Sequence, residues 1–255
     1  AEQMARRRGI LTLKEEGAAF RLGDTYLESL TDFDVVFRTP GMYYLSEELT
    51  QARKNGVAVV SEMEVFFTLC PCRLYAVTGS DGKTTTTTLI SRFFEEDGRR
   101  VHLGGNIGRA LLPLIEEIRP EDVAVVELSS FQLISMRQSP DVAVVTNIAP
   151  NHLDVHKGGM QEYIDAKRNL LWHQNGFSRS VLNADNGLSA SLAPDVRGEL
   201  CYFSRLHPVE RGAYLDGEGC LCRVKNGVVE RIVPKTEIRI PGDHNVENYL
   251  AAIAA

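Results

Sequence analysis

A strand, a glycine-rich turn and a helix follow one another in this chain, and that succession constrains the fold more than any other feature. The apolar run Leu74–Val77 predicts a buried strand, and Lys83–Phe94 predicts a helix closed by Gly98. The turn between them, Thr78–Thr85, reads Thr-Gly-Ser-Asp-Gly-Lys-Thr-Thr. In that context the turn is typical of a phosphate-binding loop in an α/β protein.

The residue types of this turn suit the terminal phosphates of a nucleotide. Glycines let backbone N–H groups converge on phosphate oxygens, and the helix N-terminus adds partial positive charge. Lys83 supplies a full positive charge, and the Thr84 hydroxyl can ligate Mg²⁺. Val77 stands where the ordinary pattern has a glycine, which argues against small GTPases and transport ATPases. The expected nucleotide-binding residues are Gly79, Ser80, Asp81, Gly82, Lys83, Thr84 and Thr85.

The alternative interpretation of the same segment is a glycine-rich turn with a helix-capping threonine. The flanking strand and helix argue against it. So do the five consecutive threonines Thr84–Thr88, because each β-branched residue costs about 0.6 kcal/mol of helix propensity relative to alanine. A run of poor helix formers at the start of a predicted helix is typical of a functional site.

Polar residues follow the next predicted strands. Glu127 ends the apolar run 123–126, and His152 lies shortly after the strand 142–146. Because ligand sites of open α/β sheets lie at the carboxyl ends of strands, Glu127 is a candidate metal ligand beside Lys83. Taken alone, His152 is as well explained by an exposed histidine, and Lys167 on the next helix by a surface lysine.

The composition restricts the class of protein. Of 255 residues, 44% are hydrophobic and 24% charged, which excludes a fibrous or disordered protein. The formal net charge of −6 gives no reason to expect nucleic acid or an anionic membrane as partner. We find no apolar run of the ~18 residues that a membrane span needs and no signal peptide, so a cytoplasmic location is expected. We also expect a monomer.

Five cysteines, an odd number, favour a reducing compartment. Cys70-Pro-Cys72 and Cys220-Leu-Cys222 form two C-x-C pairs. Each is one residue shorter than the usual zinc-binding C-x-x-C, and no histidine partners stand nearby. Free thiols are therefore the favoured interpretation, with zinc as the alternative.

The remaining elements predict a mostly parallel sheet flanked by helices. Before residue 70 we expect strands at 10–14, 19–22, 34–39 and 57–60, a helix at 46–54, a helix cap at 61–64 and a linker at 70–73. After it we expect strands at 101–103, 123–126, 142–146 and 180–182, and helices at 107–118, 131–137, 160–173 and 245–255. The turns Asp216–Gly219 and Asn226-Gly227 predict a small antiparallel patch within 213–240.

Several motifs together resemble the Mur ligases, the ATP-dependent amide-forming enzymes of peptidoglycan precursor synthesis. The loop Thr78–Thr85 is similar to that family's ATP loop, including its missing early glycine. Glu127–Leu133, which reads Glu-Leu-Ser-Ser-Phe-Gln-Leu, resembles the D-glutamate-adding members. Further motifs in the family's order are Thr39-Pro40-Gly41, Gly105–Gly108, Asn151–Asp154 and His244-Asn245-x-x-Asn248.

This resemblance implies a catalytic set. Lys83 would hold the ATP phosphates, while Thr84 and Glu127 would be ligands of one Mg²⁺. His152 and Lys167 would help to hold a second Mg²⁺. Lys167 is similar to a lysine that carries a carbamate in this family, and the added CO₂ would turn a cation into a metal-binding carboxylate.

The resemblance also implies substrate contacts. Asn106 and Ser129 would contact the nucleotide-sugar substrate, and Thr39 would lie near its pyrophosphate or uridine. Asn245 and Asn248 would lie near the adenine. The substrates would be UDP-N-acetylmuramoyl-L-alanine and D-glutamate, joined through an acyl phosphate.

By the same resemblance, residues 1–70 are expected to be a partial Rossmann-like UDP-substrate domain without its first βα unit. Residues 71–255 would form the central P-loop-type ATPase domain, and a C-terminal amino-acid-binding domain would lie outside the chain. The chain does not begin with Met, and its last predicted helix has no stop signal, so we also expect further residues at both ends. Such a fragment is expected to be inactive by itself.

Other functions are weighed against this one. Another amide ligase of the same superfamily is the nearest alternative, and the Ser-Ser-Phe-Gln segment after Glu127 argues against it. An inactive nucleotide-binding scaffold is disfavoured because the five expected catalytic and metal residues occur together. A GTPase is disfavoured because Asn147 is not followed by Lys-x-Asp.

Overall fold

The computed structural model describes residues 10–151 and 154–255 of the chain. Its contacts divide the chain into two compact units. One contains the residues up to Val36 together with Leu45–Val59, and the other contains Phe37–Tyr44 and Val60–Ala255. The functional division at residue 70 stays a prediction.

The small unit contains less strand than predicted. Residues 10–15 are helical, so the strand prediction at 10–14 is wrong, and residues 19–22 form neither helix nor strand. The local sequence explains the helix, because Lys14 and Glu15 are good helix formers and Gly17 follows at φ +91°, as at a helix C-terminus. The predictions around residues 35–60 are confirmed by β1 (Val35–Phe37), α2 (Glu47–Lys54) and β2 (Ala58–Val60).

The large unit is built on a nine-stranded sheet with the order β11-β10-β9-β8-β7-β6-β3-β5-β4. Strands β4 to β9, with β3, pair in parallel, and β9, β10 and β11 pair antiparallel, as predicted. The hairpin β10–β11 turns at Asn226 and Gly227, both at positive φ. The strands are β3 (Arg73–Thr78), β4 (Val101–Gly105), β5 (Val123–Glu127), β6 (Val142–Val145), β7 (Arg179–Asn183), β8 (Glu199–Ser204), β9 (Gly212–Leu215), β10 (Cys220–Lys225) and β11 (Val228–Pro234).

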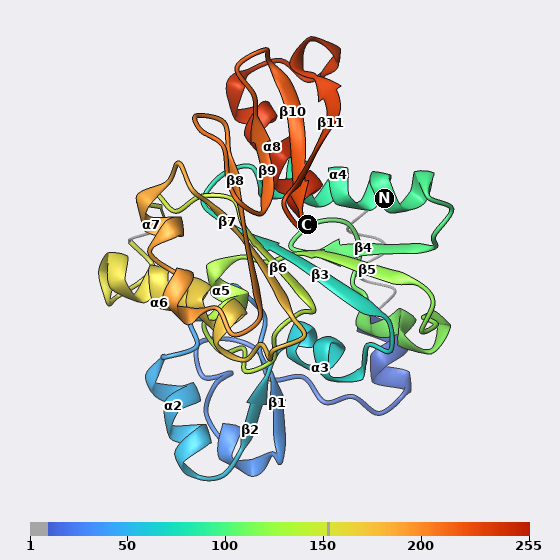
Figure 1. The fold of residues 1–255 in the computed structure, drawn as a ribbon. Helices are drawn as coiled ribbons and strands as arrows, with labels where there is room; N and C mark the ends of the chain where they lie inside the picture. Colours follow the sequence, from blue (N-terminus) through green and yellow to red (C-terminus); the bar gives the residue numbers. More distant parts are fainter. Residues whose placement is uncertain (1–9, 152–153) are drawn as a thin grey trace. The chain divides into compact units, whose positions relative to one another are not determined.

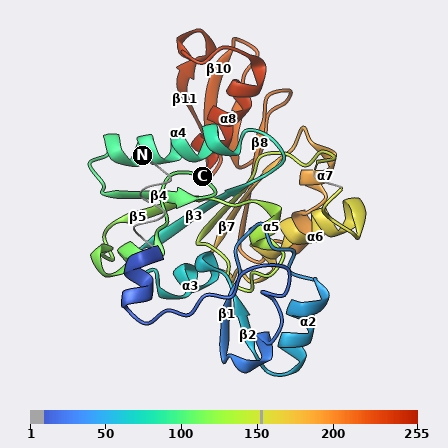
Figure 2. The ribbon, with the colours of Figure 1, turned by 180° about the vertical axis from the view of Figure 1, so that it is seen from behind.

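Helices cover both faces of the parallel part of the sheet (Figures 1 and 2). Side chains of β3, β5 and β6 alternate between two apolar clusters, as the two-residue period of a strand requires. Leu74, Ala76 and Val126 pack with α3, α5 and α6, whereas Val77 and Val125 pack with α4 and α8. The central strands are therefore apolar on both faces, which is typical of a buried parallel sheet.

The helices of this unit match most of the predictions, but the helix predicted over 131–137 is wrong for residues 134–137, because it ends at Leu133. They are α3 (Glu62–Leu69), α4 (Lys83–Glu96), α5 (Ser130–Leu133), α6 (Gly159–Trp172), α7 (Gly187–Ala190) and α8 (Asp243–Ala254), with 3₁₀ turns η2 (Leu112–Glu117), η3 (Ala193–Asp195) and η4 (Lys235–Glu237). The predicted cap at Ser61 is a capping box with Glu64. The prediction of a helix over 107–118 is wrong for residues 107–111, where Gly108 has φ +72°. No helix within the described ranges is long and apolar enough to cross a membrane.

Candidate functional site

The carboxyl ends of β3, β5 and β6 meet at one edge of the sheet, with β3 between the other two. Thr78 ends β3, Glu127 ends β5, and Thr146 follows β6. The chain passes to β5 on one side of β3 and to β6 on the other, so this edge is a topological switch point. Ligands of open α/β sheets bind at such points.

The predicted phosphate loop runs from β3 into α4, as expected. Gly79 has φ +153° and Gly82 has φ +76°, and a Cβ atom at either position would overlap a neighbouring side chain, that of Thr146 or Asn248. The side-chain oxygen of Asn147 accepts hydrogen bonds from the backbone amides of Ser80 (3.1 Å) and Asp81 (2.9 Å). Glycine is thus required at two places, and the loop is held from the end of β6.

Lys83 and Thr84 are the first two residues of α4, directly after this loop. The Lys83 ammonium donates to the Ser80 carbonyl over 2.8 Å, so it lies folded over the loop. The Thr84 hydroxyl donates to the Glu127 carboxylate over 2.6 Å. The structure therefore brings Glu127 to the start of α4, although it lies 44 positions after Lys83 in the sequence.

Glu127 is a buried acid with neutral donors. Its side chain belongs to a residue only 2% exposed. Besides Thr84, its carboxylate accepts from the Asn106 side-chain amide over 2.8 Å. Among the described residues, both hydrogen-bond partners found for this carboxylate are uncharged.

The threonine run has a structural explanation. Thr87 and Thr88 donate to the carbonyls of Lys83 and Thr84, four residues earlier in α4. Thr86 donates to the side-chain oxygen of Asn248 over 3.3 Å. The hydroxyls thus bond to the backbone of the first turns of α4 and to α8.

Lys167 is not a surface lysine: it is 1% exposed in α6. Its ammonium donates to the Gly79 carbonyl (2.9 Å) and the Thr78 hydroxyl (3.3 Å), and it lies 4.4 Å from the centre of the Tyr163 ring. Burial, and secondarily the charge of Lys83, lower the pKa of Lys167 to about 7. Near neutral pH a large fraction of this amine is uncharged. His152, the predicted companion of Lys167, lies outside the described residues.

Asn245 and Asn248 lie together at the start of α8. The Asn248 amide donates to the Asn245 side-chain oxygen over 3.1 Å, and both residues are buried. Asn248 also lines a cavity of about 400 Å³ that includes Gly82 of the phosphate loop, Phe203 and His244. This cavity has an aromatic wall beside the loop, which suits a nucleoside whose phosphates lie on the loop.

The predicted substrate residues are less closely grouped. Asn106 contacts Glu127, as above. Ser129 caps α5 through a capping box with Gln132, so its hydroxyl is used within its own helix. Thr39 is exposed, and its carbonyl accepts from Arg38 and from the Met42 amide. Among the described residues, neither of these hydrogen bonds joins Thr39 to the phosphate loop.

Comparison with known proteins now decides the family. The Mur ligase middle domain matches residues 77–255. The chain belongs to the Mur ligase family. Similar curated proteins are the UDP-N-acetylmuramoylalanine--D-glutamate ligases of Acetivibrio thermocellus (52% identical) and Ruminiclostridium cellulolyticum (49%). These alignments cover 92% and 95% of this Mur ligase chain but 50% and 52% of the relatives, so the chain spans about half their length.

Solved structures agree on the fold of this Mur ligase chain. A UDP-N-acetylmuramoyl-L-alanyl-D-glutamate--2,6-diaminopimelate ligase superposes with a TM-score of 0.60 over 86% of this chain and 55% of its own, at 18% identity. A UDP-N-acetylmuramate:L-alanyl-gamma-D-glutamyl-meso-diaminopimelate ligase from Neisseria meningitides gives 0.59 over 89% and 75%, also at 18%. At this identity the likeness concerns the fold alone, and it confirms the α/β prediction.

Sequence reasoning missed a buried arginine and a buried polar chain in this Mur ligase. Arg38, 3% exposed, donates to the Phe131 carbonyl (3.0 Å) and the Ser135 hydroxyl (3.1 Å). His156, 1% exposed, joins the Ser130 hydroxyl and the Glu162 carboxylate, each at 2.9 Å. Their signal was proximity in sequence to Thr39-Pro40-Gly41 and to the Asn151–Asp154 motif, which does not itself reveal burial.

Tyr163 connects this polar chain to the loop. Its hydroxyl lies 2.9 Å from that of Ser80, and its ring meets the His156 ring edge-on at 5.4 Å.

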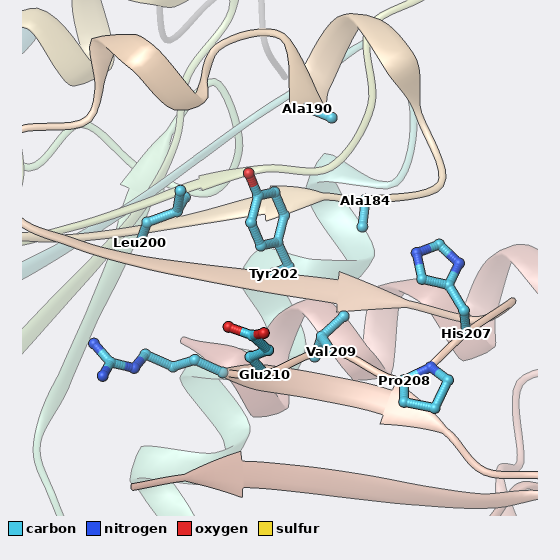
Figure 3. A pocket seen from close by; sticks show the side chains of 9 residues that line it. Ala184, Ala190, Leu200, Tyr202, His207, Pro208, Val209 and Glu210 are labelled. Atoms are coloured by element: carbon cyan, nitrogen blue, oxygen red, sulfur yellow. The ribbon is translucent and has the colours of Figure 1, made fainter. Parts of the chain in front are cut away.

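A second cavity of this Mur ligase, about 600 Å³, lies beside β8 and is lined by Tyr202, His207 and other residues (Figure 3). None of the described residues predicted as a site lines it.

Proposed function

We propose that this chain is the ATP-binding part of an enzyme that joins D-glutamate to UDP-N-acetylmuramoyl-L-alanine. The single observation that carries the proposal is the convergence of Lys83, Thr84 and Glu127 on one glycine loop. The names of the relatives at 52% and 49% identity support the choice of substrates. Because the chain spans about half of those relatives, the activity is proposed for a protein of their full length.

The donor set fits a magnesium ion. Mg²⁺ takes oxygen ligands, and it is held by one or two carboxylates with substrate phosphates. The Thr84 hydroxyl and the Glu127 carboxylate are both oxygen donors, and their oxygens lie 2.6 Å apart. When bound, Mg²⁺ would neutralise charge on the phosphates. Thr84 and Glu127 would hold it at the mouth of the loop.

The chemistry requires two anions to meet, because the alanine carboxylate must approach the ATP γ-phosphate. Two unit charges 4 Å apart repel by about 4 kcal/mol at an effective dielectric of 20. Lys83 and the amides at the start of α4 offset that repulsion and stabilise charge on the transferring group. The carboxylate oxygen attacks the phosphorus, ADP leaves, and an acyl phosphate results. The D-glutamate amine then attacks the acyl carbon, and phosphate leaves.

Lys167 is proposed to act in this site as a carbamate. Carbamate formation requires an uncharged amine, and burial lowers the pKa of this residue to about 7. Its position 2.9 Å from the Gly79 carbonyl supports a place beside the phosphates. His152 stays its predicted partner at a second Mg²⁺.

The remaining roles are proposals of the same kind. Asn245 and Asn248 would contact the adenine in the 400 Å³ cavity, which Asn248, Phe203 and His244 line. Asn106, Ser129 and Thr39 would contact the nucleotide-sugar substrate. The protein is proposed to act in the cytoplasm, in peptidoglycan precursor synthesis, as a monomer.

The test is made in the longer protein that contains this chain. Lys83→Ala should lower ADP release on the order of 100- to 1000-fold with both substrates present, because a transition-state charge partner is lost. Lys225→Ala, at an exposed position in β10, is the matched control and should keep normal turnover. Normal ADP release by Lys83→Ala would refute the proposal. A panel of amino acids would identify the acceptor, since only D-glutamate should stimulate the reaction.

A further inference from the structure

Two thiols lie close together where α3 ends and β3 begins. The Cys70 and Cys72 sulfur atoms are 3.6 Å apart. Cys70 is the C-terminal cap of α3, with its amide bonded to the Phe66 carbonyl, and Arg73 opens β3. Pro71 between them fixes one backbone angle, which limits how far the two thiols can separate. A disulfide bond needs a sulfur–sulfur distance of about 2.05 Å, so rotation about side-chain bonds has little distance to close.

The two thiols have different environments. Cys70 is partly exposed, whereas Cys72 is 6% exposed and packs in the core cluster of α3 and β3. A hydrogen bond from the Cys72 thiol lowers the pKa of Cys70, against the opposing effect of burial. The same hydrogen bond, with burial, raises the pKa of Cys72. Cys70 is thus the accessible nucleophile, and Cys72 is a protected thiol beside it.

We propose that Cys70 and Cys72 are a redox-active dithiol, which hydrogen peroxide oxidises to an intramolecular disulfide. This site is separate from the phosphate loop and does not depend on the proposed ligase function. The favoured interpretation of the C-x-C pairs as free thiols holds for the reduced protein, in which all five cysteines are free.

The reaction balances in two steps. The Cys70 thiolate attacks one peroxide oxygen, the O–O bond breaks, and hydroxide leaves and takes up a proton to become water. Cys70 then carries a sulfenic acid. The Cys72 sulfur attacks the Cys70 sulfur, the S–O bond breaks, and a second water leaves with the Cys72 proton. Two electrons pass from the pair of sulfurs to the peroxide.

The second C-x-C pair provides an internal control. Cys220 and Cys222 are both buried in β10, and burial followed by the Asp216 charge raises the pKa of Cys222 to about 11. With Asp216 they form a cluster whose ligand atoms lie within 4.8 Å of one another. The Arg231 guanidinium is 3.2 Å from the Asp216 carboxylate, so this acid already has a positively charged partner. This pair should react slowly with peroxide.

The experiment exposes the full folded chain to graded hydrogen peroxide and then alkylates the remaining thiols under denaturing conditions. Trypsin separates the two pairs, because residues 55–73 and 212–223 form different peptides. Peptide 55–73 should escape alkylation and be lighter by two hydrogen atoms, at a rate roughly tenfold or more above that of peptide 212–223. Reduction with dithiothreitol should restore both alkylation sites.

Two variants locate the nucleophile. Cys72→Ser should accumulate a sulfenic acid at Cys70 that dimedone traps, because no second thiol resolves it. Cys70→Ser should leave Cys72 alkylatable after the same peroxide exposure. The proposal is overturned if peptide 55–73 stays alkylated in the wild-type chain, if 212–223 oxidises as fast, or if dimedone labels Cys72 in Cys70→Ser as fast as it labels Cys70 in Cys72→Ser.

Discussion

The two edges of the parallel sheet each hold a buried acid, and the two acids have different hydrogen-bond donors. At the amino edge, Asp122 lies just before β5, is 3% exposed, and accepts from His102 (2.8 Å) and from the Arg119 amide (3.0 Å). At the carboxyl edge, Glu127 ends the same strand, is equally buried, and contacts a hydroxyl and a side-chain amide.

The difference lies in the hydrogen-bond donors that each acid has. Burial opposes the ionisation of Asp122, but the hydrogen bonds from His102 and Arg119 outweigh it and lower the pKa of Asp122. A stable partner within the protein makes Asp122 a structural residue. Glu127 has a hydroxyl and a side-chain amide as its donors, at the edge where a ligand would bind. Burial of an acid is therefore a weak guide to function until its donors are known.

The comparison predicts that substitution of Glu127 lowers activity, whereas substitution of Asp122 lowers stability. The largest effect should be at Glu127. In the longer protein, Glu127→Gln should lower kcat on the order of 100-fold or more, because the amide keeps the shape but loses the charge. Steady-state ADP release measures it. Asp122→Asn is the matched control, and equal losses of kcat in the two variants at equal folded fraction would contradict the comparison.

Lys167 extends the comparison to a buried cation at the carboxyl edge. Its pKa of about 7 lies below that of an unfolded lysine, so folding disfavours its proton. The penalty is complete below pH 7 and falls as pH rises toward the unfolded pKa, because the unfolded chain then binds more protons. Between pH 7 and 9 the stability gained by wild type relative to Lys167→Met should approach about 1.4 kcal/mol per pH unit.

Urea unfolding at a series of pH values measures this dependence. The Lys225→Met variant should run parallel to wild type, because that side chain is exposed in β10. Curves for wild type and Lys167→Met that stay parallel over the whole range would show that Lys167 keeps an ordinary pKa.

At the amino edge the expected loss is one of stability. Asp122→Ala should lower the free energy of unfolding by about 1–3 kcal/mol, because His102 and the Arg119 amide lose their buried acceptor. The lowered pKa of Asp122 means that its contribution is present at neutral pH and disappears as pH falls through that pKa. Urea unfolding of wild type and variant should therefore converge in acid, and a constant difference down to pH 2 would be the contrary result.

The smallest expected effect comes from two glycines at the ends of α4, Gly82 and Gly98. Gly82 and Gly98 flank α4 with nearly equal φ values of +76° and +77°, but only at Gly82 would a Cβ meet another side chain, that of Asn248. Gly98→Ala should cost about 1 kcal/mol of stability. Gly82→Ala should cost more and also weaken nucleotide binding, as measured by calorimetry. Equal costs with unchanged nucleotide affinity would show that the Asn248 contact is unimportant.

Much of the large unit was predictable because its signals are local. The apolar runs of β3, β5 and β6 are fully buried, and the glycine loop before Lys83 has a recognisable pattern. Ser61 and Glu64 have capping-box spacing. Local signals give wrong predictions at two places. At residues 10–14 a short apolar run predicts a strand, but the helix-forming charged residues there form a helix. At 107–111 a helix is predicted, but Gly108 has a positive φ.

The tertiary parts of the site could not be predicted from local patterns. Burial of Lys167 depends on how α6 packs beneath the loop, and the roles of Asn147 and Phe203 depend on which strand ends adjoin. The proximity of the Cys70 and Cys72 sulfurs likewise depends on side-chain rotation, since C-x-C spacing alone allows several arrangements.

The Asn147 side chain has a consequence for nucleotide affinity. By accepting from two successive amides of the loop, it keeps the curvature of the backbone when no phosphate is present. The conformational entropy of that turn is lost when the chain folds, so an arriving nucleotide meets a receptor that is already shaped. Nucleotide affinity then depends chiefly on the contacts that the nucleotide makes, and less on the cost of ordering the loop.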